Sequence, residues 1–320
     1  MRYEVYSAFD TRVPFRFHGG LAQAADRRAR LTAFDLVPTE TPADPRRVWA
    51  KLDQAARDAA YNNNNAVANS AALIEERNAA AVIARTARSG ALDIPYAESE
   101  RTRFDLYPAA DKAAPCLVFI HGGYWQRNSR DVFAALADGA LASGWSVAMP
   151  GYSLAPAVTL TQIVSEIGRA LDWLVETGPS HGIAGPIVVA GWSAGAQLTA
   201  MALSHPGVTA GLAISGVYDL APIRDTYLNE ALRISDAEIA SLSPLRLPPV
   251  IKPLAIAYGT AELPALIWDS RHLHALRAAT HAPGALIPVA GANHFTILDE
   301  LRRRDGILLK AARDLVGGHA

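Results

Sequence analysis

The chain is 320 residues long, with 50% hydrophobic residues, 19% charged residues and a formal net charge of -1. This length and composition are typical of an ordinary globular protein with one large domain or two small ones. A nearly neutral chain without a long run of like charges lacks the basic surface that attracts nucleic acids or acidic membranes, so we expect neither as a partner. The expected partner is a small-molecule substrate, and a homodimer is left open.

The single cysteine, Cys116, excludes an intrachain disulfide. It precedes the apolar run 117–120, and we expect it to be buried rather than reactive. The N-terminal residues lack the uninterrupted apolar stretch of a signal peptide, and no segment has the roughly 18 to 20 apolar residues of a membrane helix. These observations predict a cytoplasmic protein.

The first part of the chain divides into two segments of different character. Residues 1–45 are rich in charges and prolines without a sustained period, and we expect an irregular N-terminal arm that wraps the domain or another subunit. Residues 46–90 are rich in helix formers on both sides of the asparagines at 62–65. They predict two helices with a break at the asparagines, which we interpret as a cap and turn, with a binding role as the alternative.

From about residue 93, strand and helix patterns alternate. Strands are expected at 101–109, 116–123, 145–152, 186–195, 211–220, 253–262 and 285–291, and helices at 129–144, 159–178, 194–204, about 265–280 and 296–316. This alternation predicts an α/β domain over 46–320, with a mostly parallel sheet and helices on both faces. Residues 221–249 interrupt it with a helical, then proline-rich segment, which predicts a small helical cap or lid.

The sequence around one serine follows a pattern that catalysis requires. Gly191-Trp192-Ser193-Ala194-Gly195 fits G-x-S-x-G, follows an apolar strand and opens a helix. A sharp turn at this point would project the serine hydroxyl into a cleft, with the glycines leaving room for strand and helix. The helix N-terminus behind the turn favours developing negative charge. We therefore predict Ser193 as a nucleophile.

A serine hydroxyl needs a base, which in this arrangement follows it along the chain. His294 lies between the last expected strand and the last expected helix, where a loop can present its imidazole to the turn. The other downstream histidines suit surface, turn, helix-end or tail positions: His205, His272, His274, His281 and His319. We predict His294 as the base.

The acid that orients the histidine should follow a late strand. Glu262 directly follows the strand expected at 253–262. Asp219 follows the preceding strand and is its rival, and Asp269 lies deeper in the next helix. We favour Glu262, and interpret Asp219 as a cap or turn residue if it is not the acid.

A glycine-rich motif upstream of the serine predicts an oxyanion hole. His121-Gly122-Gly123-Tyr124-Trp125 follows the strand expected at 116–123. Glycines let backbone N–H groups approach a developing oxyanion closely. The predicted donors are Gly122 or Gly123, together with the residue after the nucleophile, Ala194. His121 could be a second base, but we favour a structural role in which it holds this loop.

No metal or cofactor is expected. The chain has no HExxH motif, no paired cysteines and no acidic cluster at ligand spacing, and its glycine-rich segments lack a dinucleotide or P-loop context. The residues alone therefore predict cofactor-independent acyl transfer.

Five segments together resemble one family: HGGYW, GYSLAPAVTLTQIVSEI, GWSAG, SGVYDL and GANHF. They resemble the kynurenine formamidase (arylformamidase) branch of the α/β hydrolases, over roughly residues 50–300. The resemblance implies the α/β-hydrolase fold and hydrolysis of an aryl formamide to an amine and formate. It assigns the roles of nucleophile, acid, base and oxyanion donors to the residues named above. It also implies that Tyr124 and Trp125 lie near the substrate. We add Trp192 and His121 as candidate substrate-binding residues.

The chain departs from this family in two respects. The acid position is usually Asp and here is Glu262, and residues 1–45 match nothing in the family. A small-acyl carboxylesterase or another amidase is the alternative activity, because this fold carries many substrates. A third hypothesis is a catalytically inactive binding protein. The presence of both Ser193 and His294 argues against it.

Overall fold

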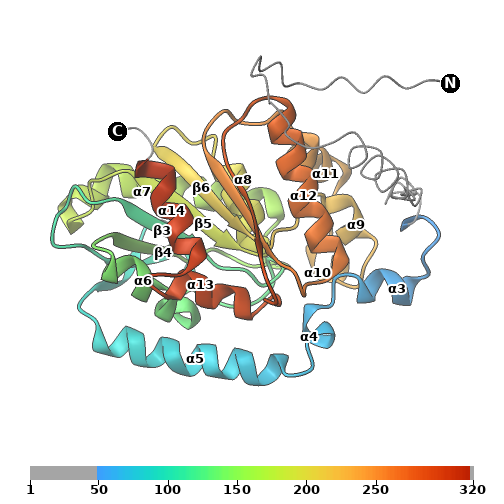
Figure 1. The fold of residues 1–320 in the computed structure, drawn as a ribbon, viewed down its shortest axis with the longest axis horizontal. Coiled ribbons are helices and arrows are strands. Elements are labelled where there is room, and N and C mark those ends of the chain that lie inside the picture. Colours follow the sequence, from blue (N-terminus) through green and yellow to red (C-terminus); the bar gives the residue numbers. More distant parts are fainter. Residues whose placement is uncertain (1–48, 318–320) are drawn as a thin grey trace, which may run out of the picture. The chain divides into compact units, whose positions relative to one another are not determined.

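An eight-stranded sheet organises the described part of the chain, residues 49–317 of the computed structural model (Figure 1). The strand order is β1-β2-β4-β3-β5-β6-β7-β8. The strands are β1 Ala91–Pro95, β2 Arg103–Tyr107, β3 Cys116–Ile120, β4 Ser146–Pro150, β5 Ile187–Trp192, β6 Val208–Ile214, β7 Leu254–Gly259 and β8 Leu286–Val289. The arm predicted at 1–45 lies outside the described residues.

The sheet is mostly parallel, as the sequence predicts. β1 pairs antiparallel with β2, and β2 pairs antiparallel with β4, whereas every pair from β4 to β8 is parallel. The sequence analysis missed β1. This edge strand is short, half-exposed and ends in Pro95, so it lacks the apolar run that marks the buried strands.

The central strands owe their positions to continuous apolar runs. Every residue of β3 and of β5 is buried, as parallel strands covered on both faces require. On one face, Phe119 and Val188 belong to a core cluster that includes Phe133 and Leu308 from outside the sheet. Cys116, the first residue of β3, is fully buried as expected, and burial raises the pKa of its thiol to about 12.

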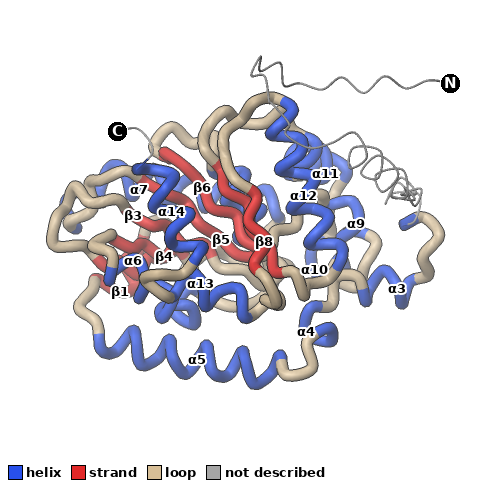
Figure 2. Tube along the Cα trace, in the orientation of Figure 1, coloured by secondary structure: helices blue, strands red, loops and turns tan. Residues whose placement is uncertain are grey.

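Helices cover both faces of the sheet (Figure 2). Those that follow the first strands are η1 Arg130–Leu136, α6 Ala137–Ala142, α7 Leu160–Thr177, η2 Gly178–His181 and α8 Ala194–Ala202. Near the C-terminus they are α12 Pro264–Ala279, η4 Thr296–Leu298, α13 Asp299–Arg302 and α14 Ile307–Gly317. α7 begins where Thr159 and Gln162 form a reciprocal capping box, which fits its predicted start.

The closing helix expected at 296–316 is a wrong prediction. The segment instead forms η4, α13 and α14, with a break between the last two. Arg303 leaves the helical region with ψ 140°, and a Cβ at Gly306 would lie 2.1 Å from the carbonyl oxygen of Glu300. This close approach needs a glycine, which breaks an otherwise helical pattern.

Residues 50–90 contain three helices rather than two. They are α3 Gln54–Ala59, α4 Asn63–Ala66 and α5 Ser70–Ala87. The asparagines expected to form only a break include one helical turn, α4, in which the Asn62 side chain accepts a hydrogen bond from the backbone N–H of Asn65. The cap was predicted, but the turn of helix was not.

The segment 221–249 is helical and then proline-rich, as expected. It contains most of α9 Leu220–Arg224, followed by α10 Asn229–Leu232, α11 Asp236–Leu242 and η3 Pro244–Arg246. Asp58 of α3 accepts a hydrogen bond from the backbone N–H of Tyr227 in this segment. None of the helices among residues 49–317 is long and apolar enough to cross a membrane.

Candidate active site

Ser193 stands on a strained turn between β5 and α8. Its φ of 58° lies in the left-handed region, which costs free energy for a residue other than glycine. A Cβ at Gly191 would lie 2.1 Å from the carbonyl oxygen of Gly195, and a Cβ at Gly195 would lie 2.1 Å from that of Ile120. The two glycines therefore allow strand and helix to pass at backbone contact. The turn leaves Ser193 at the N-terminus of α8.

The sheet register brings the predicted oxyanion loop to this turn. Ile120 at the end of β3 pairs with Gly191 near the end of β5, so both segments leave the sheet at the same edge. A Cβ at Gly122 would lie 2.5 Å from the carbonyl oxygen of Trp192 and 2.9 Å from the Cβ of Ser193. Only a glycine fits at this distance from the serine.

The residues after Gly122 follow an unusual backbone path. Gly123, Tyr124 and Trp125 have φ values of 125°, 50° and 57°. Three successive positive φ angles turn the loop sharply, and residues held in such strain concentrate at functional sites. Among the described residues, none accepts a hydrogen bond from the backbone N–H of Gly123. The N–H of Ala194 is at the first position of α8, where helical N–H groups have no intrahelical partner.

His294 and Glu262 form a buried pair. His294 Nδ1 lies 3.1 Å from Glu262 Oε2, and the two residues are 3% and 8% exposed. The other carboxylate oxygen of Glu262 accepts hydrogen bonds from Ser215 Oγ at 2.5 Å and from the backbone N–H of Gly259 at 2.8 Å. These donors fix the carboxylate and satisfy it inside the protein. The sequence analysis did not single out Ser215.

The two rival acids have other partners. Asp219 pairs with Arg246 at 2.8 Å and caps α9 through the backbone N–H of Ala221. Asp269 is buried in α12 and accepts a hydrogen bond from the backbone N–H of Tyr218 at 2.6 Å. The structure therefore brings Glu262, rather than Asp219 or Asp269, to His294.

The other candidate histidines within residues 49–317 have other partners or belong to other elements. His205 pairs with Asp172 at 2.9 Å just beyond the end of α8. His272 and His274 are in α12, and His281 is in the turn that follows. His319 lies outside the described residues.

His121 holds the oxyanion loop through a hydrogen bond to the backbone. It is 1% exposed, its Nδ1 donates to the carbonyl oxygen of Gly122 at 2.9 Å, and its ring stacks on Tyr152 with centroids 4.2 Å apart. Burial lowers the pKa of His121 to about 3, so the imidazole is neutral at physiological pH. This geometry fits the structural role that the sequence analysis favoured over a second base.

A cavity of about 250 Å³ opens over the serine. Five residues that the sequence analysis selected line it: Gly123, Tyr124, Trp192, Ser193 and His294. His121 and Trp125 do not line it, although both were candidates for substrate contact. Trp125 is fully buried, and its indole N–H donates to Gln197 at 3.2 Å, so its side chain is part of the core under the loop.

Several residues of this cavity come from segments that no catalytic motif marks. They are Asn62, Asn63, Asn64, Ile74, Arg77, Arg127, Asn128, Tyr227 and Phe295. Three of the four asparagines at 62–65 therefore lie at the cavity, as the alternative binding interpretation allowed. Asn63 donates to the hydroxyl of Tyr124 at 2.9 Å, and this hydroxyl donates to the carbonyl oxygen of Tyr61 at 2.6 Å. These bonds join α4 to the oxyanion loop.

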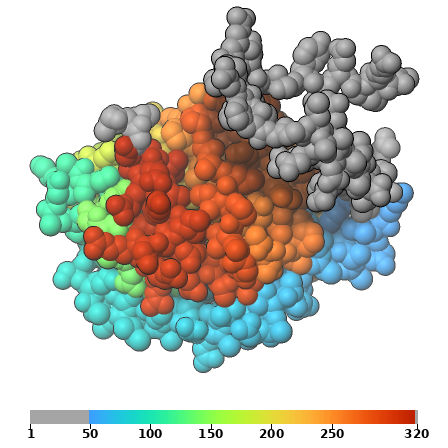
Figure 3. Space-filling model, in the orientation of Figure 1, coloured from blue at the N-terminus to red at the C-terminus, as the bar shows by residue number. Residues whose placement is uncertain are grey.

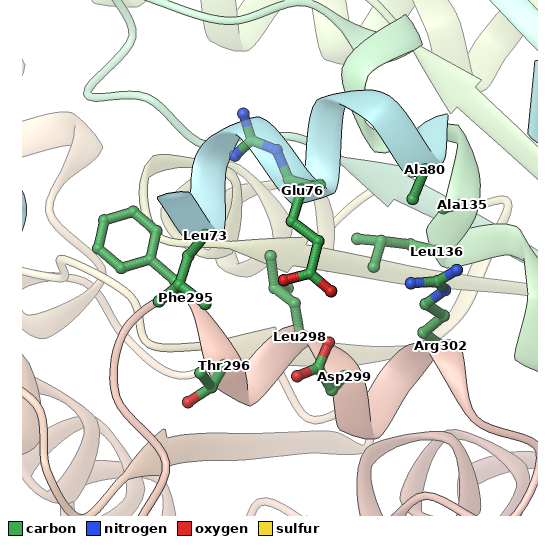
Figure 4. A pocket seen from close by; sticks show the side chains of 11 residues that line it. Leu73, Glu76, Ala80, Ala135, Leu136, Phe295, Thr296, Leu298, Asp299 and Arg302 are labelled. Carbon is green, nitrogen blue, oxygen red and sulfur yellow. The ribbon is translucent and has the colours of Figure 1, made fainter. Parts of the chain in front are cut away.

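A second, smaller cavity of about 70 Å³ lies between α5 and the η4–α13 segment (Figure 4). Glu76 of α5 and Asp299 of α13 extend into it in Figure 4. Figure 3 shows the same two parts of the chain adjoining at the surface. This cavity has no serine or histidine in its lining. Within residues 49–317, no group of three or more His, Cys, Asp or Glu could hold a metal ion.

Several known proteins are similar to this chain. The BD-FAE family model matches residues 104–210, from β2 into β6. Kynurenine formamidase of Danio rerio is 29% identical over 250 residues, which are 73% of this chain and 84% of the relative. The chain has the α/β-hydrolase fold and is similar to kynurenine formamidase. Its strands, turn and loop are therefore those of a hydrolase fold.

Solved structures have the same fold. The chain superposes on a "putative thioesterase" from Silicibacter sp. tm1040 with a TM-score of 0.71 and 29% identity, over 80% of this chain and 98% of the other. Esterase LipW of Mycobacterium marinum has a TM-score of 0.66 and 18% identity, over 84% of this chain and 96% of its own. The second likeness concerns the fold alone. The α/β-hydrolase fold predicted from the sequence is thus confirmed.

Proposed function

We propose that this α/β hydrolase is a cytoplasmic serine hydrolase that cleaves an aryl formamide to an amine and formate. The observation that carries the proposal is the contact of His294 Nδ1 with Glu262 Oε2 at 3.1 Å, in a cavity that Ser193 shares. A hydroxyl, an imidazole and a carboxylate in this order are the groups that acyl transfer requires.

In the first step, the Ser193 hydroxyl attacks the formyl carbon and His294 accepts its proton. The carbonyl oxygen becomes negatively charged and is stabilised by backbone N–H groups of the oxyanion loop, from Gly122 or Gly123, and of Ala194. The N-terminus of α8 adds a favourable dipole at the same place. Glu262 holds the imidazole in one tautomer and stabilises the imidazolium.

In the second half, His294 gives its proton to the amine nitrogen as the C–N bond breaks. The products are the free amine and a formyl ester on Ser193. Water then attacks this ester, and His294 accepts a proton from the water. His294 returns this proton to the Ser193 oxygen as formate leaves. No cofactor takes part in this scheme.

Aryl formamides suit the lining of the cavity. Trp192, Phe295 and Tyr227 offer aromatic surfaces that can pack against an aromatic amine. A formyl group needs very little room beside the serine. The similarity to kynurenine formamidase of Danio rerio supports the same substrate class. A small-acyl ester is the alternative substrate, supported by the fold it shares with esterases.

The segment 221–249 is proposed to act as a cap over this cavity, because Tyr227 lines it. A homodimer remains a prediction from the sequence.

Formate release from N-formylkynurenine, measured beside hydrolysis of short-chain p-nitrophenyl esters, tests the proposal. Wild type is expected to hydrolyse the formamide, and Ser193→Ala to lose this activity by at least about 10³-fold while its circular dichroism stays native. Ester hydrolysis without formamide hydrolysis would replace the formamidase by an esterase. No activity on either substrate class, together with no labelling by a fluorophosphonate, would indicate an inactive binding protein. Undiminished activity in Ser193→Ala would refute the serine mechanism.

A further inference from the structure

The lining of the serine cavity carries an uncompensated positive charge. Arg77 and Arg127 line it, and no Asp or Glu does. Glu262 lies behind His294, with its own donors from Ser215 and Gly259. A concave site with cations and no carboxylate attracts anions.

Arg77 has an environment that leaves its charge free for a ligand. Its guanidinium stacks on Phe133, with Cζ 4.3 Å from the ring centroid. Its Nε and Nη2 donate to the side-chain oxygen of Asn78 at 3.2 Å and 2.9 Å. Nη1 donates to no acceptor in the described part of the chain. These contacts hold the guanidinium of Arg77 in one orientation and leave the N–H groups of Nη1 available to a ligand.

Two neighbouring arginines, Arg85 and Arg130, have carboxylate partners. Arg85 contacts Asp105 at 2.9 Å, and Arg130 contacts the same Asp105 at 3.1 Å. Arg77 has no ion pair within residues 49–317. Burial alone lowers the pKa of Arg77, to about 10, so it keeps its charge at neutral pH without a carboxylate to balance it.

The second cavity, which Arg77 also lines, contains two carboxylates. Glu76 and Asp299 extend into that cavity (Figure 4), and neither forms an ion pair with Arg77 in the described part of the chain. A desolvated guanidinium without a counter-charge costs free energy, and such groups are usually paired. A ligand that brings a carboxylate would remove this cost.

We propose that Arg77 is a specificity-determining residue that binds a carboxylate on the leaving-group amine of the substrate. The inference rests on the proposed function, in which the formyl group is neutral and any charge must lie on the amine portion of the substrate. The preferred substrates are then aryl formamides whose amine portion bears a carboxylate, rather than neutral aryl formamides. Arg127 is exposed and contributes only to the general field of the cavity.

The test compares two substrates that differ only in this charge, N-formylkynurenine and its carboxamide. Wild type is expected to prefer the carboxylate in kcat/KM by roughly 10- to 100-fold, the factor for hydrogen bonds to a charged group. Arg77→Met should bring the ratio close to one, mainly through a higher KM for the carboxylate. Arg77→Lys should keep part of the preference. Because each ratio is internal to one variant, partial misfolding affects both substrates alike.

Arg127→Met is the matched control, since it removes the other cation of the cavity. It is expected to keep most of the preference. Equal kcat/KM values for the two substrates in wild type would overturn the inference, as would a preference that survives Arg77→Met or disappears in Arg127→Met.

A failure of the proposed function can be separated from a failure of this inference. If neither formamide is hydrolysed, the formamidase proposal fails. The carboxylate site is then tested by competition of kynurenine and kynurenine carboxamide against p-nitrophenyl acetate hydrolysis, or against fluorophosphonate labelling if the ester is not a substrate. Stronger competition by kynurenine that Arg77→Met abolishes would support the site, and equal competition would overturn it.

Discussion

At the scale of single residues, Gly191 and Gly195 determine whether the serine turn can form. A Cβ at Gly195 would lie 2.1 Å from the carbonyl oxygen of Ile120, a backbone atom that cannot move aside. Gly168 in α7 is the opposite case, because an added Cβ there meets nothing within 4 Å. The same substitution therefore has opposite consequences at the two positions.

We expect Gly195→Ala to lower the free energy of unfolding by about 3 kcal/mol, since overpacking forces strand and helix apart. Gly168→Ala should raise it by about 0.5–1 kcal/mol, because alanine is a better helix former. Urea denaturation of both variants checks the pair. A Gly195→Ala protein as stable as wild type would show that the turn is not at backbone contact.

The choice of acid is also a question about single residues. Glu262→Gln should lower kcat by roughly 10³- to 10⁴-fold, because the amide no longer favours the reactive tautomer and charge state of His294. Asp219→Asn, the control, should cost about 1 kcal/mol of stability through its bond to Arg246 and leave kcat within a few-fold. Steady-state kinetics and urea midpoints measure both. The reverse ranking in kcat would make Asp219 the acid.

At the scale of elements, the central strands and the helices between them could be predicted because each has its own signal. Buried runs such as 116–120 predict strands, and the Thr159 capping box predicts the start of α7. Positions that depend on distant contacts could not be predicted. Gly306 breaks the last helix through a contact with Glu300, and the edge strand β1 has no apolar run.

The candidate site also contains residues that local sequence predicts and residues that it does not. Ser193, Glu262 and His294 follow strands, so their common edge follows from the parallel order. Arg77 could not be predicted as a cavity residue, because nothing local shows that α5 reaches the serine. Its place depends on packing of α5 against η1, which only the folded chain reveals.

The contact between α4 and the oxyanion loop gives a prediction about elements. Tyr124→Phe removes a hydroxyl that bonds both Asn63 and the carbonyl oxygen of Tyr61. We expect a loss of about 1–2 kcal/mol of stability, because the buried partners of the hydroxyl are left unsatisfied. We also expect KM to rise several-fold, because Asn63 and Tyr124 line the cavity and are no longer held together. Tyr96→Phe also removes a bond to a backbone carbonyl, that of Gly151, but neither residue lines the cavity. Equal KM changes in both variants would contradict a role of this contact in the cavity.

At the scale of the whole molecule, a buried acid makes stability depend on pH. Burial raises the pKa of Asp269 from its ordinary value of 3.8 to about 8. The folded state then holds a proton that the unfolded state has lost, so stability falls as pH rises through this window. Asp269→Asn removes the titration but keeps an oxygen to accept from the Tyr218 N–H.

We expect wild type to lose more stability than Asp269→Asn between about pH 5 and pH 8, by at least about 1.4 kcal/mol, the value of one pKa unit. Urea midpoints at the two pH values measure the difference. Parallel pH profiles for the two proteins would mean that Asp269 titrates alike in the folded and unfolded states.

The serine mechanism is tested most directly by finding which residue is covalently modified and whether its modification requires His294 and Glu262. Wild type is incubated with a fluorophosphonate, and its adduct is located by mass spectrometry of peptides. We expect one modified residue, Ser193, with labelling slowed by orders of magnitude in His294→Ala and Glu262→Gln and absent in Ser193→Ala. Labelling elsewhere, or labelling at Ser193 that is equally fast without His294, would contradict it.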